Sequence, residues 1–297
     1  MEKPNRKKER CNCRGFYSAF FVFFGFIGIF LWHFGTLFLG PFPNLNQPIP
    51  PGLPVEVLSF RDEAGTFLKG WLIKGQPGKG VVVVLHGHGG NKSMSLGRVR
   101  FLHDAGYSVF VFDFQGHGES QLKSVTLGYE EARNVRAALA LLKSRLPKEK
   151  IALIGPSLGG AALLVKGQVI PADAYIFEGV YYSLERTGEH RLAEITGQGI
   201  AHWLAPLLAA QVRLRLGFSA DALEPIATVS ELKAPVLIIG GTKDPYVTEE
   251  ETKVLYEKAP EPKELWLVEG GGHLDFFLFG PSEYKRRVLA FLETHFK

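Results

Sequence analysis

Residues 151–160 read IALIGPSLGG, and this stretch decides the fold class that the sequence predicts. Its first four residues are apolar and typical of a buried strand, and a helical pattern begins directly after Ser157. Ser157 is therefore expected on a tight strand-to-helix turn that exposes its hydroxyl group. Gly155 and Gly159 flank it, as needed where larger side chains would collide between strand and helix. The short pattern also occurs by chance, but its position between strand and helix favours a nucleophilic serine.

Apolar runs and helical patterns alternate on both sides of this motif. Strands are expected at 66–74, 80–86, 107–113, 151–155, 174–177, 236–240 and 264–268, and helices at 93–105, 128–146, 158–167, 248–258 and 281–296. Apolar runs without alternation are typical of strands covered on both faces, as in a parallel sheet. The pattern predicts a three-layer α/β domain over 56–297. Within it, 184–217 is a helical cap insertion, of which 184–216 reads as continuous helix.

The first 55 residues differ in composition from this domain. Residues 1–15 form a basic tail with six Lys or Arg, and 16–40 are predicted to be a transmembrane helix. The 24 uncharged residues 16–39 would reach about 36 Å as a helix, enough for a hydrocarbon layer of about 30 Å. Residues 41–55 include six prolines and are expected to form a semi-rigid linker.

Charge also predicts the orientation of this segment. No Lys or Arg follows the apolar run until Arg61, so the N-terminus is expected in the cytoplasm and the main domain outside it. A cleaved signal peptide is the alternative, but the run is long and no small-residue cleavage site follows it. We therefore expect a retained signal-anchor.

Net charge bears on nucleic-acid binding, and the positions of the cysteines bear on lipid attachment. The formal net charge is +4, and the basic tail accounts for all of it, so the neutral main domain has no electrostatic footprint for nucleic acid. The two cysteines of the sequence, Cys11 and Cys13, lie in the tail. S-acylation of this pair is an alternative to two free thiols, which we favour.

Further polar residues follow other predicted strands. The sequence HGHGGN at 86–91 comes directly after a valine-rich strand, and its small residues allow backbone N–H groups to converge on an oxyanion. We expect the amides of His88 and of Leu158, at the start of a helix, to form this oxyanion hole. A metal site at the two histidines is disfavoured because Cys, Asp and Glu ligands are missing nearby, and no cofactor is expected.

Two more strand ends supply a carboxylate and an imidazole. Asp244 and His273 each lie just beyond a predicted strand, and the carboxyl ends of parallel strands share one edge of a sheet. Serine needs an imidazole to take its proton, and the imidazole needs a carboxylate to orient it. The order Ser157, Asp244, His273 thus predicts a catalytic triad. Glu178 is an alternative carboxylate, whereas Asp275 is interpreted as a surface residue.

Together these motifs resemble the α/β-hydrolase superfamily over roughly residues 56–297. The sequence DFQGHGES at 113–120 is similar to the D-x-x-G-x-G-x-S loop of the lineage of serine aminopeptidases and monoacylglycerol-lipase-like enzymes. The resemblance implies the α/β-hydrolase fold, with a mostly parallel central sheet flanked by helices. It also implies Ser157 as nucleophile, Asp244 as its acid partner, His273 as base, and the amides of His88 and Leu158 as oxyanion donors. The 113–120 loop, with His117, would be structural.

The expected function is that of a membrane-anchored serine hydrolase. It would cleave small-molecule acyl esters, as a carboxylesterase or lipase does, through an acyl-enzyme and without a cofactor. One alternative is a catalytically silent membrane protein that binds a lipid or a partner. Another is an acyltransferase, thioesterase or peptidase that uses the same triad.

Overall fold

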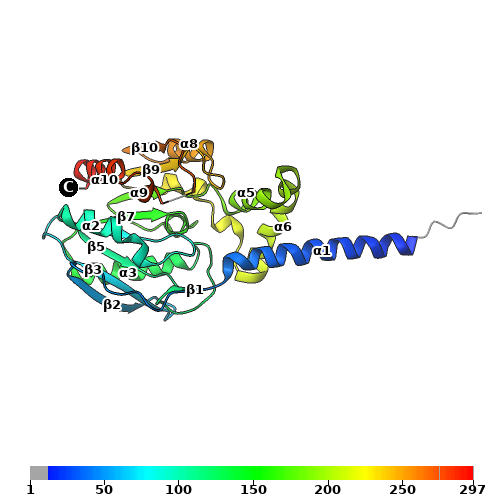
Figure 1. Ribbon diagram of the computed structural model, residues 1–297, viewed down its shortest axis with the longest axis horizontal. Helices are drawn as coiled ribbons and strands as arrows, with labels where there is room; N and C mark the ends of the chain where they lie inside the picture. Colours follow the sequence, from blue (N-terminus) through cyan, green and yellow to red (C-terminus); the bar gives the residue numbers. More distant parts are fainter. Residues whose placement is uncertain (1–12, 274, 297) are drawn as a thin grey trace, which may run out of the picture.

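The computed structural model describes residues 13–273 and 275–296, and a twisted sheet forms the centre of this part of the chain (Figure 1). Its eight strands, in the described residues, have the order β10-β9-β8-β7-β4-β5-β3-β2. The strands are β2 (Val55–Arg61), β3 (Phe67–Ile73), β4 (Val81–Val84), β5 (Ser108–Phe112), β7 (Ile151–Pro156), β8 (Ala174–Glu178), β9 (Val236–Gly241) and β10 (Lys263–Val268). β3 pairs antiparallel with β2 and β5, and all other neighbours are parallel.

Helices cover both faces of the sheet. On one face α2 (Leu96–Asp104) and α10 (Pro281–His295) pack on Val82 and Val84 of the central strand β4. On the other, α3 (Glu131–Arg145) and α8 (Glu249–Lys258) share a core with Val81 and Val83. Because alternate side chains of a strand point to opposite faces, a run of four valines supplies both cores. The predicted fold class, a mostly parallel sheet between helical layers, is confirmed.

Several elements differ from those expected. β2 is a strand that the apolar pattern did not identify. The helix expected at 158–167 is only the single turn α4 (Leu158–Ala161), whose two glycines are poor helix formers. The segment expected as continuous helix over 184–216 is two helices, α5 (Leu184–Thr196) and α6 (Gln198–Leu216). Gly197 separates them because its φ of +79° lies outside the helical region.

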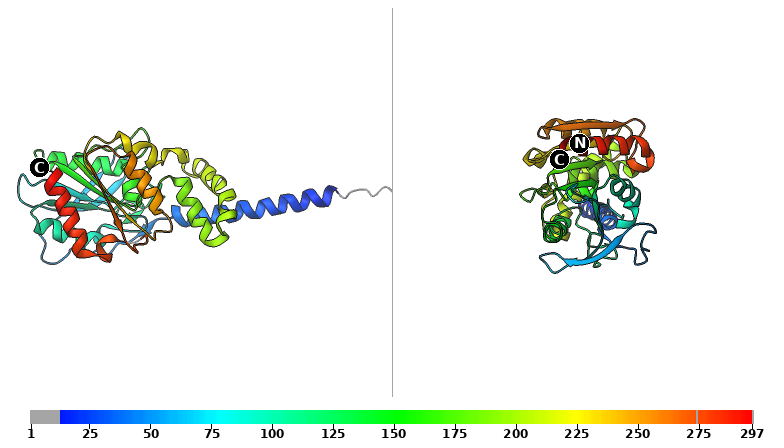
Figure 2. Two further views of the ribbon diagram at one scale, coloured as in Figure 1. Left: turned by 90° about the horizontal axis from the view of Figure 1, so that it is seen from above. Right: turned by 90° about the vertical axis from the view of Figure 1, so that its left-hand side faces the viewer.

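The N-terminal helix α1 (Cys13–Leu39) extends away from the sheet, and its C-terminal part lies beside α5 and α6 (Figures 1 and 2). Within the described residues, it is the one helix with the length and hydropathy of a membrane span, over Phe21–Leu39, and a signal sequence would share these features. Leu31 and Phe34 are buried against Ala201 and Ala205 of α6. Most of the predicted basic tail, with Cys11, lies outside the described residues.

The proline-rich segment after α1 lies against the main domain. The short strand β1 (Phe42–Pro43) pairs with β6 (His117–Gly118), and the amide of Asn44 donates to the Gly118 carbonyl at 3.0 Å. The side chain of Gln47 is buried. These contacts hold the segment on the 113–120 loop. The remaining short helices are η1 (Lys92–Ser95), η2 (Ala220–Ala222), α7 (Pro225–Thr228), η3 (Val229–Glu231) and α9 (Phe276–Phe279).

Candidate active site

Ser157 occupies a strained turn between β7 and α4. Its φ of +45° and ψ of −116° are rare for a residue with a side chain, and such strain concentrates at functional sites. The amide of Ser157 donates to the Glu178 carbonyl on the adjacent strand β8 at 2.8 Å, which fixes the turn. A Cβ atom added to Gly155 would lie 2.6 Å from the Gly160 Cα atom, and one added to Gly159 would lie 2.8 Å from the Leu85 Cβ atom. The turn therefore requires glycine at both positions.

The structure brings the side chains of Ser157, His273 and Asp244 together in one hydrogen-bonded chain. The Ser157 Oγ atom lies 3.2 Å from His273 Nε2, and His273 Nδ1 lies 2.7 Å from Asp244 Oδ2. The Asp244 side chain is fully buried, whereas that of His273 is 21% exposed. The chain of hydrogen bonds thus begins at the buried Asp244 carboxylate and passes through the part-exposed His273 imidazole to the Ser157 hydroxyl group.

Backbone contacts fix the two loops that carry Asp244 and His273. Asp244 Oδ1 accepts hydrogen bonds from the amides of Tyr246 at 2.8 Å and Val247 at 2.9 Å, so its other oxygen is left for the histidine. The amide of Lys243, in the Asp244 loop, donates to the Gly271 carbonyl in the His273 loop at 2.8 Å. The carboxylate is therefore oriented by its own loop, and the two loops are joined.

The backbone of residues 86–90 lies beside Ser157. A Cβ atom added to Gly87 would be 3.8 Å from the Ser157 Cβ atom. Among the described residues, no acceptor bonds the amide of His88 or that of Leu158, so both N–H groups are available to a ligand. The imidazole ring of His88 points toward the last turn of α1. There its Nε2 donates to the Phe38 carbonyl at 2.9 Å.

Two buried histidines support this loop from behind. His86 Nδ1 donates to the Gly87 carbonyl at 2.8 Å, and its Nε2 accepts from the Phe114 amide at 3.0 Å. His117 Nε2 accepts from the Gly89 amide at 3.2 Å. Burial lowers the pKa of His86 to about 4 and that of His117 to about 3. Both rings are therefore neutral near pH 7 and bonded to the backbone. No group of three His, Cys, Asp or Glu side chains suited to a metal ion occurs in the described part of the chain.

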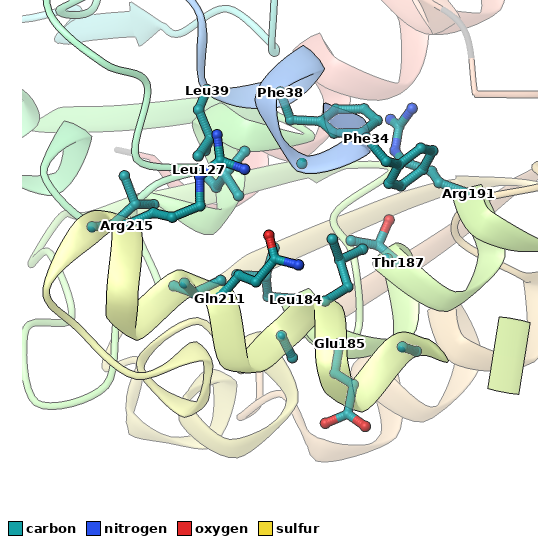
Figure 3. Close-up of a pocket in the computed structure, with 17 residues that line it drawn as sticks. Phe34, Phe38, Leu39, Leu127, Leu184, Glu185, Thr187, Arg191, Gln211 and Arg215 are labelled. Atoms are coloured by element: carbon teal, nitrogen blue, oxygen red, sulfur yellow. The ribbon is translucent and has the colours of Figure 1, made fainter. Parts of the chain in front are cut away.

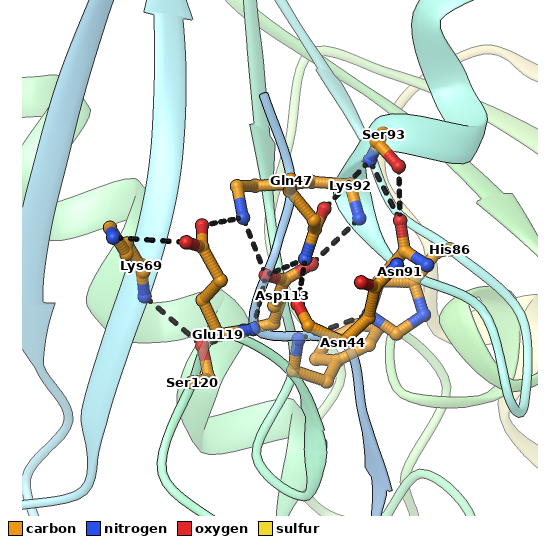
Figure 4. A network of polar contacts seen from close by, with 11 residues as sticks. Asn44, Gln47, Lys69, His86, Asn91, Lys92, Ser93, Asp113, Glu119 and Ser120 are labelled. Carbon is orange, nitrogen blue, oxygen red and sulfur yellow. Dashed lines mark hydrogen bonds and ion pairs between the residues drawn. The ribbon is translucent and has the colours of Figure 1, made fainter. Parts of the chain in front are cut away.

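A buried ion-pair network that the sequence did not reveal fixes the far end of the same loop (Figure 4). The Lys92 ammonium contacts Asp113 Oδ2 at 2.7 Å and Glu119 Oε2 at 2.6 Å, and the Lys92 side chain is fully buried. Its amide donates to Asp113 Oδ1 at 2.7 Å. Gln47 Nε2 also donates to Asp113 Oδ2, at 3.0 Å. Asp113 thus links the glycine-rich loop, the 113–120 loop and the proline-rich segment. The sequence offered one indication of this network, which is that Lys92 directly follows HGHGGN.

The two rival carboxylates belong to another cluster, centred on Arg98. Arg98 Nη2 lies 2.6 Å from Glu178 Oε2, and Arg98 Nη1 donates to Asp275 Oδ2 at 2.9 Å. Tyr284 donates to the other oxygen of Glu178. Glu178 is therefore committed to Arg98, and Asp275 is an ion-pair partner and the N-cap of α9, not only a surface residue as interpreted from the sequence. Arg98 and Asp275 line a polar cavity together with Ser157 and His273.

Comparisons with known proteins agree with this architecture. A model of the alpha/beta hydrolase family matches residues 82–288. The chain is 28% identical to the uncharacterized protein YqkD of Bacillus subtilis over 236 residues, which cover 77% of this chain and 76% of YqkD. It is 31% identical to the uncharacterized protein Rv2307c of Mycobacterium tuberculosis over 240 residues, covering 80% and 77% of the two chains. The esterase Pf2001 of Pyrococcus furiosus has a similar structure, with a TM-score of 0.69 at 24% identity, over 87% of this chain and all of that one.

The family model covers more than half of the sequence, and its range includes Ser157, Asp244 and His273. The order of the strands, the strained serine turn and the match to the family lead to one conclusion. The chain belongs to the alpha/beta hydrolase family.

Proposed function

We propose that this chain is a membrane-anchored serine hydrolase that cleaves acyl esters. The observation that carries the proposal is the hydrogen-bond chain from Asp244 through His273 to the hydroxyl group of Ser157. Membership of a hydrolase family and structural similarity to a protein named as an esterase support hydrolysis as the type of reaction.

In the proposed reaction, the Ser157 Oγ atom attacks the carbonyl carbon of the ester while His273 Nε2 takes the hydroxyl proton. Asp244 keeps the Nδ1–H tautomer of His273 in place and balances the charge that the ring gains. The amides of His88 and Leu158 stabilise the oxyanion. The imidazolium then protonates the leaving alcohol, an acyl-enzyme remains on Ser157, and water activated by His273 releases the acid.

We propose that residues 1–15 are a cytoplasmic tail, 16–40 a transmembrane helix, 41–55 a linker and 56–297 the hydrolase domain, with 184–217 as its cap. The apolar helix over Phe21–Leu39 and the six basic residues before it support this arrangement. The hydrolase domain would then lie outside the cytoplasm, with its cap next to the membrane.

Covalent labelling tests the nucleophile. A fluorophosphonate probe should label the full-length protein, and Ser157→Ala should abolish the labelling. Ser95→Ala is the matched control, because Ser95 lines the same polar cavity without bonding a histidine, and it should remain labelled. Strong labelling of Ser157→Ala would refute the assignment. Release of free acid from an ester by the wild type would distinguish hydrolysis from acyl transfer.

A further inference from the structure

An apolar groove lies between the end of α1 and the cap helices α5 and α6 (Figure 3). Apolar side chains and two glycines make up most of its lining: Phe34, Gly35, Phe38 and Leu39 from α1, and Leu184, Gly188, Ala205, Leu208, Ala209, Val212 and Leu216 from the cap. Its space is about 660 Å³ when the open side is included. In Figure 3, Phe34 and Phe38 face Leu184 and Gln211 across this space, while the Glu185 carboxylate points away from it.

The groove adjoins the cavity that contains the reactive hydroxyl group. This second cavity is lined by Ser157, His88 and His273, and it shares five residues with the groove: Phe38, Leu127, Leu184, Thr187 and Arg191. Phe38 thus belongs to the walls of both spaces. The last turn of α1 is therefore part of the boundary of the candidate active site.

Specific contacts hold α1 at this position. Arg215 of α6 donates to the Trp32 carbonyl at 2.8 Å and to the Thr36 hydroxyl at 2.7 Å. A Cβ atom added to Gly35 would lie 2.8 Å from Arg215 Nη1, so glycine allows this close approach. At the inner end, the Arg191 guanidinium lies 5.2 Å from the centre of the Phe38 ring. The groove is therefore a built feature of the α1–cap interface.

We propose that this groove binds the hydrocarbon chain of a membrane-derived long-chain acyl ester, so that α1 supplies a wall of the acyl site as well as an anchor. The proposal rests on the proposed function, since it places the ester group of this substrate at Ser157. An acyl chain suits the apolar lining and the connection to the serine cavity. We place the source of this ester in the bilayer because one wall of the groove is formed by the end of α1, the helix proposed to cross the membrane.

The outer surface of the cap supports contact with the same bilayer. Helix α6 lies beside α1, and several of its large apolar side chains are exposed: Ile200, Trp203, Leu207 and Leu214. Exposed apolar patches of this kind mark sites of membrane or protein contact. If the cap contacts the lipid surface, the groove lies at the membrane interface, where an acyl chain could pass from the bilayer into it.

Filling the groove tests the proposal. In full-length protein in detergent micelles, Gly188→Leu should lower kcat/KM for a sixteen-carbon acyl ester about tenfold or more and change that for a four-carbon ester by less than about twofold. Gly199→Leu is the matched control, because Gly199 is an exposed glycine of the same cap that does not line the groove, and a Cβ atom added there would have no other atom within 4 Å. Both esters should react with this variant almost as with the wild type. Equal losses on both esters, or none, would overturn the proposal.

The contribution of α1 needs a separate pair of variants. Phe38→Ala should lower the ratio of long-chain to short-chain turnover about fivefold or more, in the range of discrimination expected from an apolar pocket. Leu37→Ala alters the adjacent residue, which is 68% exposed and does not line the groove, and should leave the ratio unchanged. An identical ratio in both variants would exclude α1 from the acyl site.

A binding measurement separates this proposal from the proposed function. Full-length Ser157→Ala cannot turn over substrate but keeps the groove, so it should bind a fluorescent sixteen-carbon fatty acid, and adding Gly188→Leu should weaken this binding about tenfold. If the wild type is neither labelled by the probe nor hydrolyses any ester, the proposed hydrolase function is refuted. If the wild type is labelled and hydrolyses esters, but Ser157→Ala binds the fatty acid equally well with and without Gly188→Leu, only the acyl-groove proposal is refuted.

Discussion

His88 Nε2 donates a hydrogen bond of 2.9 Å to the carbonyl oxygen of Phe38, and it joins the loop beside Ser157 to the last turn of α1. Carbonyl groups in the last turn of a helix have no partner within the helix, so the imidazole satisfies one of them. Burial lowers the pKa of His88, which keeps the ring neutral. The end of the proposed anchor is thus coupled to the backbone that would bind the oxyanion.

Breaking this link should reduce activity without removing the nucleophile. In His88→Phe the backbone amide remains, but the part-buried Phe38 carbonyl loses its donor, at a cost of roughly 0.5–1.5 kcal/mol. We expect kcat for a short ester to fall about tenfold, with fluorophosphonate labelling retained. His202→Phe is the control, because His202 is largely exposed on the cap. Equal kcat values for the two variants would mean that α1 does not influence the loop.

Asp244→Asn tests the acid partner of His273. An amide in place of the carboxylate would favour the wrong imidazole tautomer, and in a serine protease triad the same change lowers kcat by about 10⁴. We expect a loss of roughly 10³–10⁴ here, measured as kcat on a short ester. Asp275→Asn, two residues from the same histidine but bonded to Arg98, should lose less than about tenfold. Near-normal turnover by Asp244→Asn would transfer the acid role to another carboxylate.

The sequence identified most of the sheet because its central strands are buried on both faces. The valines of β4 contact both helical layers, and such continuous apolar runs are recognisable without a structure. Helix lengths were harder to predict, since apolar periodicity continues through a residue whose backbone leaves the helix. Gly197 ends α5 in this way, and only its φ angle shows the break.

For the candidate site, the sequence located the residues that parallel topology brings to one edge. Ser157 and His273 are 116 positions apart, yet each follows a strand of the same sheet. Its supporting residues could not be found in this way. Arg98 is a buried cation whose partner Tyr284 lies 186 positions away, and charged residues of this kind look like surface residues until their partners are known.

Acid should destabilise the fold through the buried histidines. Burial lowers the pKa of His86 from 6.5 to about 4, so the unfolded chain binds more protons than the folded chain between these values. The free energy of unfolding is therefore unaffected by the titration of this group above pH 6.5. It falls as the pH drops toward 4, by up to roughly 3 kcal/mol for a pKa shift of this size. Chemical denaturation at pH 7 and pH 4.5 measures the loss. His86→Gln should be less stable at pH 7 but should lose less on acidification; an equal loss would assign the effect to other groups.

Removing the buried ammonium group should destabilise the protein strongly. Lys92→Met leaves the buried Asp113 carboxylate without its cation, and breaking a buried ion pair from one side costs about 3–5 kcal/mol. Lys69→Met is the matched control, since Lys69 contacts the same Glu119 from a position that is 32% exposed, and it should cost less than about 1 kcal/mol. Free energies of unfolding measure both. Similar values for the two variants would show that the buried network contributes no more than a surface ion pair.

Cysteine labelling can test the proposed orientation because the main domain has no cysteine of its own. Six cations before the apolar helix should hold the N-terminus in the cytoplasm, so a membrane-impermeant maleimide should not reach Cys11 and Cys13 in intact cells. Ser144→Cys, at an exposed position of α3, should be labelled in the same cells. Wild-type labelling without permeabilisation would reverse the orientation. Loss of an N-terminal tag from the mature domain would instead indicate a cleaved signal peptide, and the helix that lines the groove would then be absent from the active protein.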